Sequence, residues 1–198
     1  MRYSGASFPL LRIVVKGQRA VVSGTAGIFV FKLDKQPDDK ERVVHTLPTP
    51  DRLRVLHEAI AQCREKIIVF APLTSVLSVL SKELSKKWSV AVVNGQVSYK
   101  ERSEIFRQFC EAADPRIIVA DPRAMSHGLT LVAATMIIWY APIDSNETYR
   151  QANKRIDRPG QTKTTTIVQI ASTPVEREIY RRLDANESLQ GSILKLME

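Results

Sequence analysis

The stretch KIIVFAPLTSVLSVLSKELSKKWSVAVV, residues 66–93, decides the fold. It contains a continuous apolar run, residues 67–71, which predicts a strand buried on both faces. An amphipathic pattern over residues 74–87 predicts a helix, and a second apolar run, residues 90–93, predicts another buried strand. A strand, a helix and a strand in this order predict a parallel pair joined by a crossover helix.

The same alternation continues on both sides of this stretch. Thr49 and Pro50 supply a capping hydroxyl and a proline for the first helical position, so we expect a helix to begin there. Downstream we expect a helix after a capping box at Ser98 and Glu101, a strand at 117–120 and an irregular loop to 131. A strand at 136–140, a helix that begins at Ser145 and a strand at 166–170 are expected next. A second capping box at Thr173 and Glu176 predicts a last helix to about 186. Apolar strands that alternate with helices predict an α/β fold, a parallel sheet with helices on both faces.

The first part of the chain differs in character. Residues 27–33 and 42–46 predict two short strands, and the polar stretch 34–41 would connect them as a β-hairpin. Residues before 24 carry no clear period. We therefore expect three parts, which are an N-terminal extension at 1–48, the α/β domain at 49–186 and a C-terminal tail at 187–198.

Composition narrows the class of protein. At 198 residues, with 44% hydrophobic and 25% charged residues, the chain is typical of a soluble domain with one core. No apolar run approaches the length of a membrane span and the N-terminus does not resemble a signal peptide, so we expect an intracellular protein without a membrane partner. The two cysteines and three histidines lack the spacing of a metal site. A net charge of +8 favours a polyanionic partner, nucleic acid first.

The string QANKRIDRPGQ, residues 151–161, carries candidate binding residues. Gln151 and Arg155 are four apart, so on a helix they would share one face. Pro159 disfavours helical geometry in the residue before it, which puts Arg158 at a helix end or in a loop. Two guanidinium groups and an amide directed at one place suit phosphate oxygens. Taken alone, a bare Q-x-x-x-R-x-x-R pattern favours a solvated helix end with two surface arginines.

The predicted topology suggests where a site would lie. Ligands of parallel sheets bind beyond the carboxyl ends of the strands. The loops that follow those ends are 71–74, 94–98, 120–128, 141–145 and 171–173, and the approach to the arginine helix starts from the same side. We therefore expect the functional residues on that edge.

The order of four segments is informative, namely residues 66–71, the turn 94–96 with Arg102 beyond it, the stretch DPRAMSHGLTL at 121–131, and the arginine string. Residues 49–186 thereby resemble the C-terminal RecA-like lobe of a superfamily-two helicase of the Swi/Snf-like DNA translocase branch. The ending RPGQ at 158–161 is typical of that branch, whereas DEAD-box RNA helicases usually end in Gly-Arg-x-Gly-Arg. Residues 123–131 depart from the usual Arg-Ala-Gly-Gly-x-Gly-x-Asn-Leu, and His127 before the last glycine is similar to phage and prophage helicases. A viral protein would act in the cytoplasm of a bacterial host.

The resemblance implies roles for individual residues. Arg155 and Arg158 would reach the γ-phosphate of ATP held by another lobe, with Arg158 as the arginine finger. Gln151 would position the nucleotide or water, or order the arginines, and Gly128 would let the backbone approach nucleotide or DNA closely. Arg102 is expected to brace its helix against the sheet. The residues expected on the DNA backbone are Asn94, Gly95, Gln96, Arg123, Ser126 and Thr130.

Two motifs of complete motors do not occur in this sequence. There is no G-x-x-x-x-G-K-[ST] phosphate loop and no Asp-Glu pair after a strand to hold magnesium. The resemblance implies that ATP and Mg²⁺ are bound mainly by an N-terminal helicase lobe of the same or another chain. We therefore expect the C-terminal motor lobe of an ATP-dependent DNA helicase or translocase, inactive as an ATPase alone. The alternative is a stand-alone RecA-like lobe that serves as a non-enzymatic DNA-binding or regulatory partner of another motor.

Overall fold

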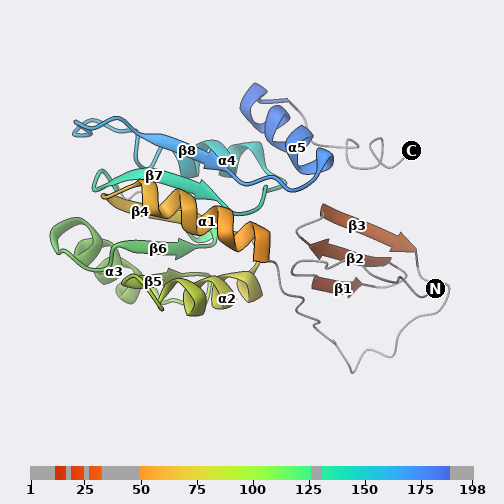
Figure 1. The fold of residues 1–198 in the computed structure, drawn as a ribbon, viewed down its shortest axis with the longest axis horizontal. Helices are drawn as coiled ribbons and strands as arrows, with labels where there is room; N and C mark the ends of the chain where they lie inside the picture. The colour runs from red at the N-terminus through yellow and green to blue at the C-terminus, as the bar shows by residue number, and fades with distance from the viewer. Residues whose placement is uncertain (1–11, 17–18, 25–26, 33–49, 126–130, 188–198) are drawn as a thin grey trace.

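The computed structural model describes residues 12–16, 19–24, 27–32, 50–125 and 131–187. It contains a five-stranded sheet of order β5-β6-β4-β7-β8 and a separate three-stranded sheet of order β1-β2-β3 (Figure 1). Every neighbouring pair in the larger sheet is parallel. The α/β fold predicted from the sequence is confirmed.

The strands of the larger sheet agree closely with the apolar runs of the sequence. They are β4 (Lys66–Phe70), β5 (Val90–Val93), β6 (Ile117–Ala120), β7 (Ala134–Trp139) and β8 (Thr166–Gln169). β4 occupies the centre, and its residues Ile67, Ile68, Val69 and Phe70 are all fully buried. β8 lies at one edge of the sheet, and its first two residues, Thr166 and Ile167, are exposed. Because all strands run the same way, their carboxyl ends lie along one edge.

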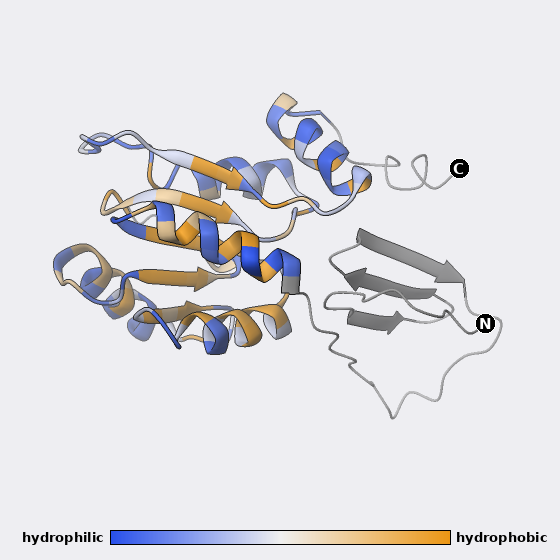
Figure 2. Cartoon of the chain, in the orientation of Figure 1, coloured by the Kyte–Doolittle hydropathy of each residue, from blue (hydrophilic) through white to orange (hydrophobic). Residues whose placement is uncertain are grey.

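Helices cover both faces of this sheet. They are α1 (Pro50–Gln62), α2 (Thr74–Leu84), α3 (Tyr99–Glu111), α4 (Asn146–Asn153) and α5 (Pro174–Ala185), and Pro122–Met125 forms a 3₁₀ turn, η1. α1 and α2 pack on one face with the buried Leu56 and Leu77, and α3, α4 and α5 pack on the other with Phe109, Tyr149 and Leu183. Figure 2 shows the strands as mostly apolar and the helices as mixed, as such packing requires.

Of the two expected capping boxes, one is complete. The Ser98 side chain accepts from the backbone N–H of Glu101, and the Glu101 carboxylate accepts from the N–H of Ser98. At α5 the Thr173 hydroxyl accepts from Glu176, but the Glu176 carboxylate accepts instead from the N–H of Ser172, at 2.7 Å, and from Arg52, at 2.9 Å. The second box is therefore only half formed, because a carboxylate that is 3% exposed requires a charged partner.

The smaller sheet differs from the expected hairpin. Strand β3 (Gly27–Lys32) lies where a strand is expected, but it pairs with β2 (Arg19–Gly24), which pairs in turn with β1 (Arg12–Lys16). The sequence before residue 24 was not expected to form strands. Its valines and isoleucines favour extended backbone, and connections as short as 17–18 and 25–26 suit antiparallel hairpins. The other expected strand, 42–46, and residues 188–198 of the tail lie outside the described residues.

Candidate functional site

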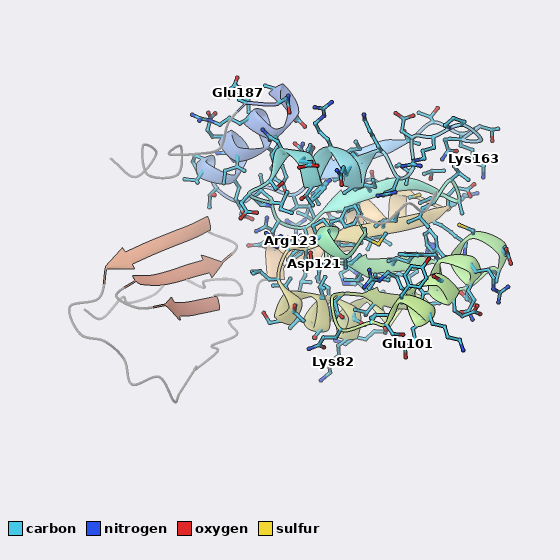
Figure 3. All side chains as sticks on the ribbon, turned by 180° about the vertical axis from the view of Figure 1, so that it is seen from behind. Lys82, Glu101, Asp121, Arg123, Lys163 and Glu187 are labelled. Carbon is cyan, nitrogen blue, oxygen red and sulfur yellow. The ribbon has the colours of Figure 1, made fainter. Side chains whose placement is uncertain are left out.

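The candidate residues form two groups at opposite edges of the sheet. Asn94 and Arg123 follow β5 and β6, so they lie at the carboxyl edge. The loop after α4 lies at the amino edge, where Lys163 forms a 2.7 Å ion pair with Glu65, the residue before β4. Figure 3 shows Arg123 and Lys163 toward opposite ends of the sheet. We expected all functional residues at the carboxyl edge of the sheet, and for Arg155 and Arg158 this expectation is wrong. The reason is that α4 runs antiparallel to the strands, from the carboxyl end of β7 back to the amino edge.

Arg155 does not lie on α4. The helix ends at Asn153, and the N–H of Arg155 bonds Ala152 O, at 3.2 Å, in a tightened last turn. The carbonyl of Arg155 accepts a 3.0 Å hydrogen bond from the N–H of Leu131, and Ile156 is buried. The prediction that Gln151 and Arg155 share a helix face is therefore wrong. A continued helix would lose both the bond to Leu131 and the burial of Ile156.

Gln161 holds the turn that carries both arginines, residues 154–161, which we call the arginine turn. Its Nε2 lies 3.1 Å from the carbonyl oxygens of Val132 and Ala134 and 3.2 Å from that of Ile156. Gly160, beside it, has φ of 102°, a conformation that favours glycine. The sequence predicts no role for Gln161. Only its place in the RPGQ ending pointed to it.

The structure brings Arg155 and Arg158 together. Arg155 is 4% exposed, and burial together with the like charge of Arg158 lowers the pKa of its guanidinium. Arg158 is half-buried and its Nε donates to the carbonyl of Lys154 at 3.3 Å. In the part of the chain that the structure describes, no acidic side chain forms an ion pair with Arg158. The arginine turn is therefore electropositive, and its chemistry fits a phosphate.

Gln151 is not joined to the arginine turn by a described hydrogen bond. It is exposed on α4, and its Nε2 donates to Glu147 at 2.9 Å on the same helix. The pair at i and i+4 is an ordinary helix-surface contact. Its expected contact with nucleotide stays a prediction.

Arg102 organises the carboxyl edge. It donates to the carbonyls of Val97 at 3.0 Å, Asn94 at 3.4 Å and Ala124 at 2.8 Å. Arg102 has a structural role, as expected, but it ties α3 to the 94–97 turn and to η1, whereas the expected contact was with the sheet. The Asn94 side chain also accepts from the N–H of Gln96, at 2.9 Å, which fixes the turn from within. The loop is thus held rigidly at the end of β5.

Arg123 lies next to this turn with a partner of its own. Its guanidinium donates to Asp144 at 2.8 Å, and its backbone N–H bonds Asp121. The side chains of Arg123 and Asp144 are 50% and 71% exposed, so water screens the pair and a phosphate could replace the carboxylate. The other expected contacts, Ser126, Gly128 and Thr130, lie outside the described residues.

Two further features of the described chain concern metal binding and membrane insertion. Among residues 50–125 and 131–187, no group of three or more histidine, cysteine, aspartate or glutamate side chains could hold a metal ion. Within the described chain, none of the helices has the length and apolar character needed to cross a bilayer.

Comparison with known proteins identifies the family. The model of the helicase conserved C-terminal domain matches residues 51–160, which are 110 of the 198 residues. The chain is 27% identical over 145 residues to the chromatin-remodeling ATPase INO80 of Arabidopsis thaliana, covering 72% of this chain and 10% of that protein. The chain thus spans about a tenth of the length of that curated relative.

Solved structures agree on the fold. The C-terminal part of the Fun30 ATPase domain superposes with a TM-score of 0.59 at 28% identity, covering 66% of this chain and 43% of that one. The C-terminal domain of the DEAD-box protein Dbp5 gives the same TM-score, 0.59, at 19% identity, covering 70% and 79%. The second likeness shows the fold alone, so the branch is decided by sequence. The chain belongs to the helicase C-terminal domain family, as a RecA-like lobe of the Swi/Snf-like branch.

Proposed function

We propose that this lobe completes an ATPase site formed with an N-terminal helicase lobe, and that Arg158 is its arginine finger. The observation that supports the proposal is the placement of two arginines in one short turn, with Arg155 buried and Arg158, three residues later, half-buried. Among the described residues no acidic side chain forms an ion pair with Arg158, so its guanidinium can take an anion supplied from outside this lobe. The phosphates of ATP have the required charge and geometry.

Arg155 and Arg158 would have different roles. Arg155 is almost fully buried and its backbone is bonded to Leu131, so it shapes the turn and adds positive potential. Arg158 is half-buried, which leaves its guanidinium able to extend toward a phosphate presented from outside. There it would neutralise charge that develops on the transferring phosphoryl group. Gln151 and Gly128 are proposed as nucleotide contacts at the same interface.

ATP and Mg²⁺ would be held mainly by the other lobe. This sequence contains no phosphate loop, and the described residues contain no cluster of metal-binding carboxylates. When bound, Mg²⁺ would supply charge neutralisation on the β- and γ-phosphates. This chain would then contribute the arginines together with the contacts of Gln151 and Gly128, and by itself it would not hydrolyse ATP.

The carboxyl edge is proposed to bind the DNA backbone. The rigid 94–96 turn presents Asn94, Gly95 and Gln96 next to Arg123, whose exposed ion pair with Asp144 a phosphate can replace. Ser126 and Thr130 are proposed to add hydroxyl contacts. Such contacts read no base sequence, as expected of a protein that tracks along DNA. The net charge of +8 agrees with a polyanionic partner.

Two variants test the proposal in the complete motor that contains both lobes. Arg158→Ala is expected to abolish ATP turnover while the dissociation constant for DNA changes little. Gln96→Ala combined with Arg123→Ala is expected to weaken DNA binding and to leave DNA-independent ATP turnover unchanged. Arg54→Ala, which removes an exposed i, i+4 pair on α1, is the matched control.

The results separate the two candidate functions. If turnover in the Arg158→Ala motor equals that of the wild type, the arginine-finger assignment is wrong, and a stand-alone DNA-binding or regulatory lobe becomes the better reading. If Gln96 and Arg123 can be removed without effect on DNA binding, the carboxyl edge is not the DNA surface.

A further inference from the structure

We propose that Asn153 is a positioning residue for the arginine turn, and that it acts through a hydrogen bond with Trp139 of β7. This inference rests on the proposed function, because it concerns the residue that sets the positions of Arg155 and Arg158. Asn153 is the last residue of α4 and lies two residues before Arg155. Nothing in the pattern of the sequence singles it out.

Trp139 provides the anchor. Its side chain is 0% exposed, and its ring lies 4.9 Å from that of Phe70 and 4.8 Å from that of Tyr149, measured between centroids. A buried indole N–H without an acceptor is costly. The acceptor is Oδ1 of Asn153, at 2.9 Å from Nε1. The indole is fixed by packing on the sheet, so its N–H defines where the end of α4 must lie.

A second set of bonds fixes the same helix one turn earlier. The hydroxyl of Tyr149 donates to Asp184 on α5 at 2.8 Å, and Gln169 on β8 donates to that hydroxyl at 2.7 Å. Burial, and then the bond to Asp184, raise the pKa of Tyr149 to about 12, while the side chain of Asn153 acts in the opposite direction. Asn153 therefore lies beside Tyr149 as well as Trp139. The polar side chains join β7, α4, β8 and α5 into one network.

This network has a specific consequence for the arginines. α4 has eight residues, too few to hold a fixed orientation by its own backbone bonds. Tyr149 and Asn153 both face the sheet, and together they prevent the helix from rotating about its axis. Beyond Asn153 the chain leaves the helix and enters the arginine turn, whose far side is held by Gln161. A shift at Asn153 would therefore pass directly to Arg155 and Arg158.

The test compares three variants of the complete two-lobe motor. Asn153→Ala removes the acceptor, Trp139→Phe removes the donor, and the double variant removes both. A misplacement of about 1 Å can cost up to about 100-fold in rate, so we expect kcat for ATP to fall about 10-fold or more in each single variant. The double variant is expected to be no worse than the poorer single variant, because the two side chains act as one unit. The KM for ATP and the affinity for DNA are expected to change less than about twofold.

Two controls make the outcome decisive. Arg150→Ala changes an exposed residue of the same helix and is expected to keep wild-type kcat. The thermal midpoint of each variant is measured, and kcat is compared well below all of them, because Trp139→Phe leaves a void in the core. A merely structural bond would lower the midpoint and leave the kcat of the folded protein unchanged.

Arg158→Ala, measured beside them, separates this inference from the proposed function. If Arg158→Ala keeps full turnover, the proposed function itself fails. If Arg158→Ala abolishes turnover while Asn153→Ala stays within about twofold of the wild type, or the two single losses multiply in the double variant, the positioning role of Asn153 is overturned.

Discussion

The backbone N–H of Leu131 donates a 3.0 Å hydrogen bond to the backbone carbonyl of Arg155. Leu131 ends the stretch 121–131, which starts at the carboxyl edge beside Arg123, and Arg155 belongs to the arginine turn at the amino edge. One stretch of chain therefore touches both groups of candidate residues. The bond uses backbone atoms only, so it does not depend on the guanidinium of Arg155.

The Gln161 brace is expected to be important for stability. Gln161→Ala removes the donor shared by three backbone carbonyl groups, which is expected to cost about 1–3 kcal/mol in the free energy of unfolding. Gln161→Glu is expected to cost more, because a carboxylate oxygen would face the carbonyls of Val132, Ala134 and Ile156. Urea denaturation measures both. The control is Gln108→Ala, which removes an exposed amide on α3. Equal stabilities of the Gln161 and Gln108 variants would contradict this role.

The buried pair Arg52–Glu176 should be far more sensitive than an exposed pair. Arg52 Nη1 lies 2.9 Å from the Glu176 carboxylate, and both side chains are almost fully buried. Glu176→Ala leaves a buried guanidinium without its carboxylate and is expected to cost about 3–5 kcal/mol. Glu58→Ala, which breaks the exposed pair with Arg54, is expected to cost about 0–1 kcal/mol. The difference is measured by chemical denaturation, and similar losses for the two variants would refute it.

Two glycines near the candidate residues are expected to respond differently to alanine. Gly160 has φ of 102°, so Gly160→Ala strains the backbone and is expected to cost about 1–3 kcal/mol. At Gly95 a Cβ would meet no atom within 4 Å, and Gly95→Ala is expected to change stability by less than about 0.5 kcal/mol. Thermal unfolding of the two variants checks this, and the reverse order would show that the turn geometry is wrong.

His57 predicts a dependence of stability on pH. Its ring lies 5.3 Å from that of Trp88, and burial first, then the charge of Lys87, lower its pKa below the ordinary 6.5. The folded state therefore disfavours the charged ring. Its stabilising contribution is present above pH 6.5 and is lost as the pH falls through the lowered pKa.

His57→Phe keeps a ring against Trp88 but does not titrate. The free energy of unfolding of the wild type is therefore expected to fall relative to that of the variant when the pH is lowered from about 7.5 to about 5. Urea denaturation at several pH values measures this difference. Parallel pH profiles would exclude the effect.

The sequence predicts the larger sheet well because the signals there are local. The apolar runs of β4, β5 and β6 are continuous, and the capping serine of α3 lies directly before its helix. The first two strands, β1 and β2, were missed because residues before 24 carry no clear period, and the structure defines them by their antiparallel pairing. Glu176 was expected to close a capping box, but the buried Arg52, 124 residues away in sequence, competes for its carboxylate.

The geometry of the candidate site could not be predicted from local spacing. The spacing of Gln151 and Arg155 indicates a shared helix, yet α4 ends at Asn153. The reasons are tertiary bonds, from Leu131 to Arg155 and from Trp139 to Asn153, between positions that no local pattern connects. The same bonds place the arginines at the amino edge. Local spacing suggests which side chains belong to the candidate site, and contacts between distant parts of the sequence determine where in the fold these side chains lie.

The most direct test of the account measures what Arg158 binds most tightly. An arginine finger stabilises the transition state rather than the ground state, so its loss should weaken binding of a transition-state mimic far more than binding of ATP. In the two-lobe motor, Arg158→Ala is expected to reduce affinity for ADP with aluminium fluoride by about 10²-fold or more, while affinity for ATP changes less than about threefold. Equal changes in the two affinities, or no change in either, would contradict the central claim.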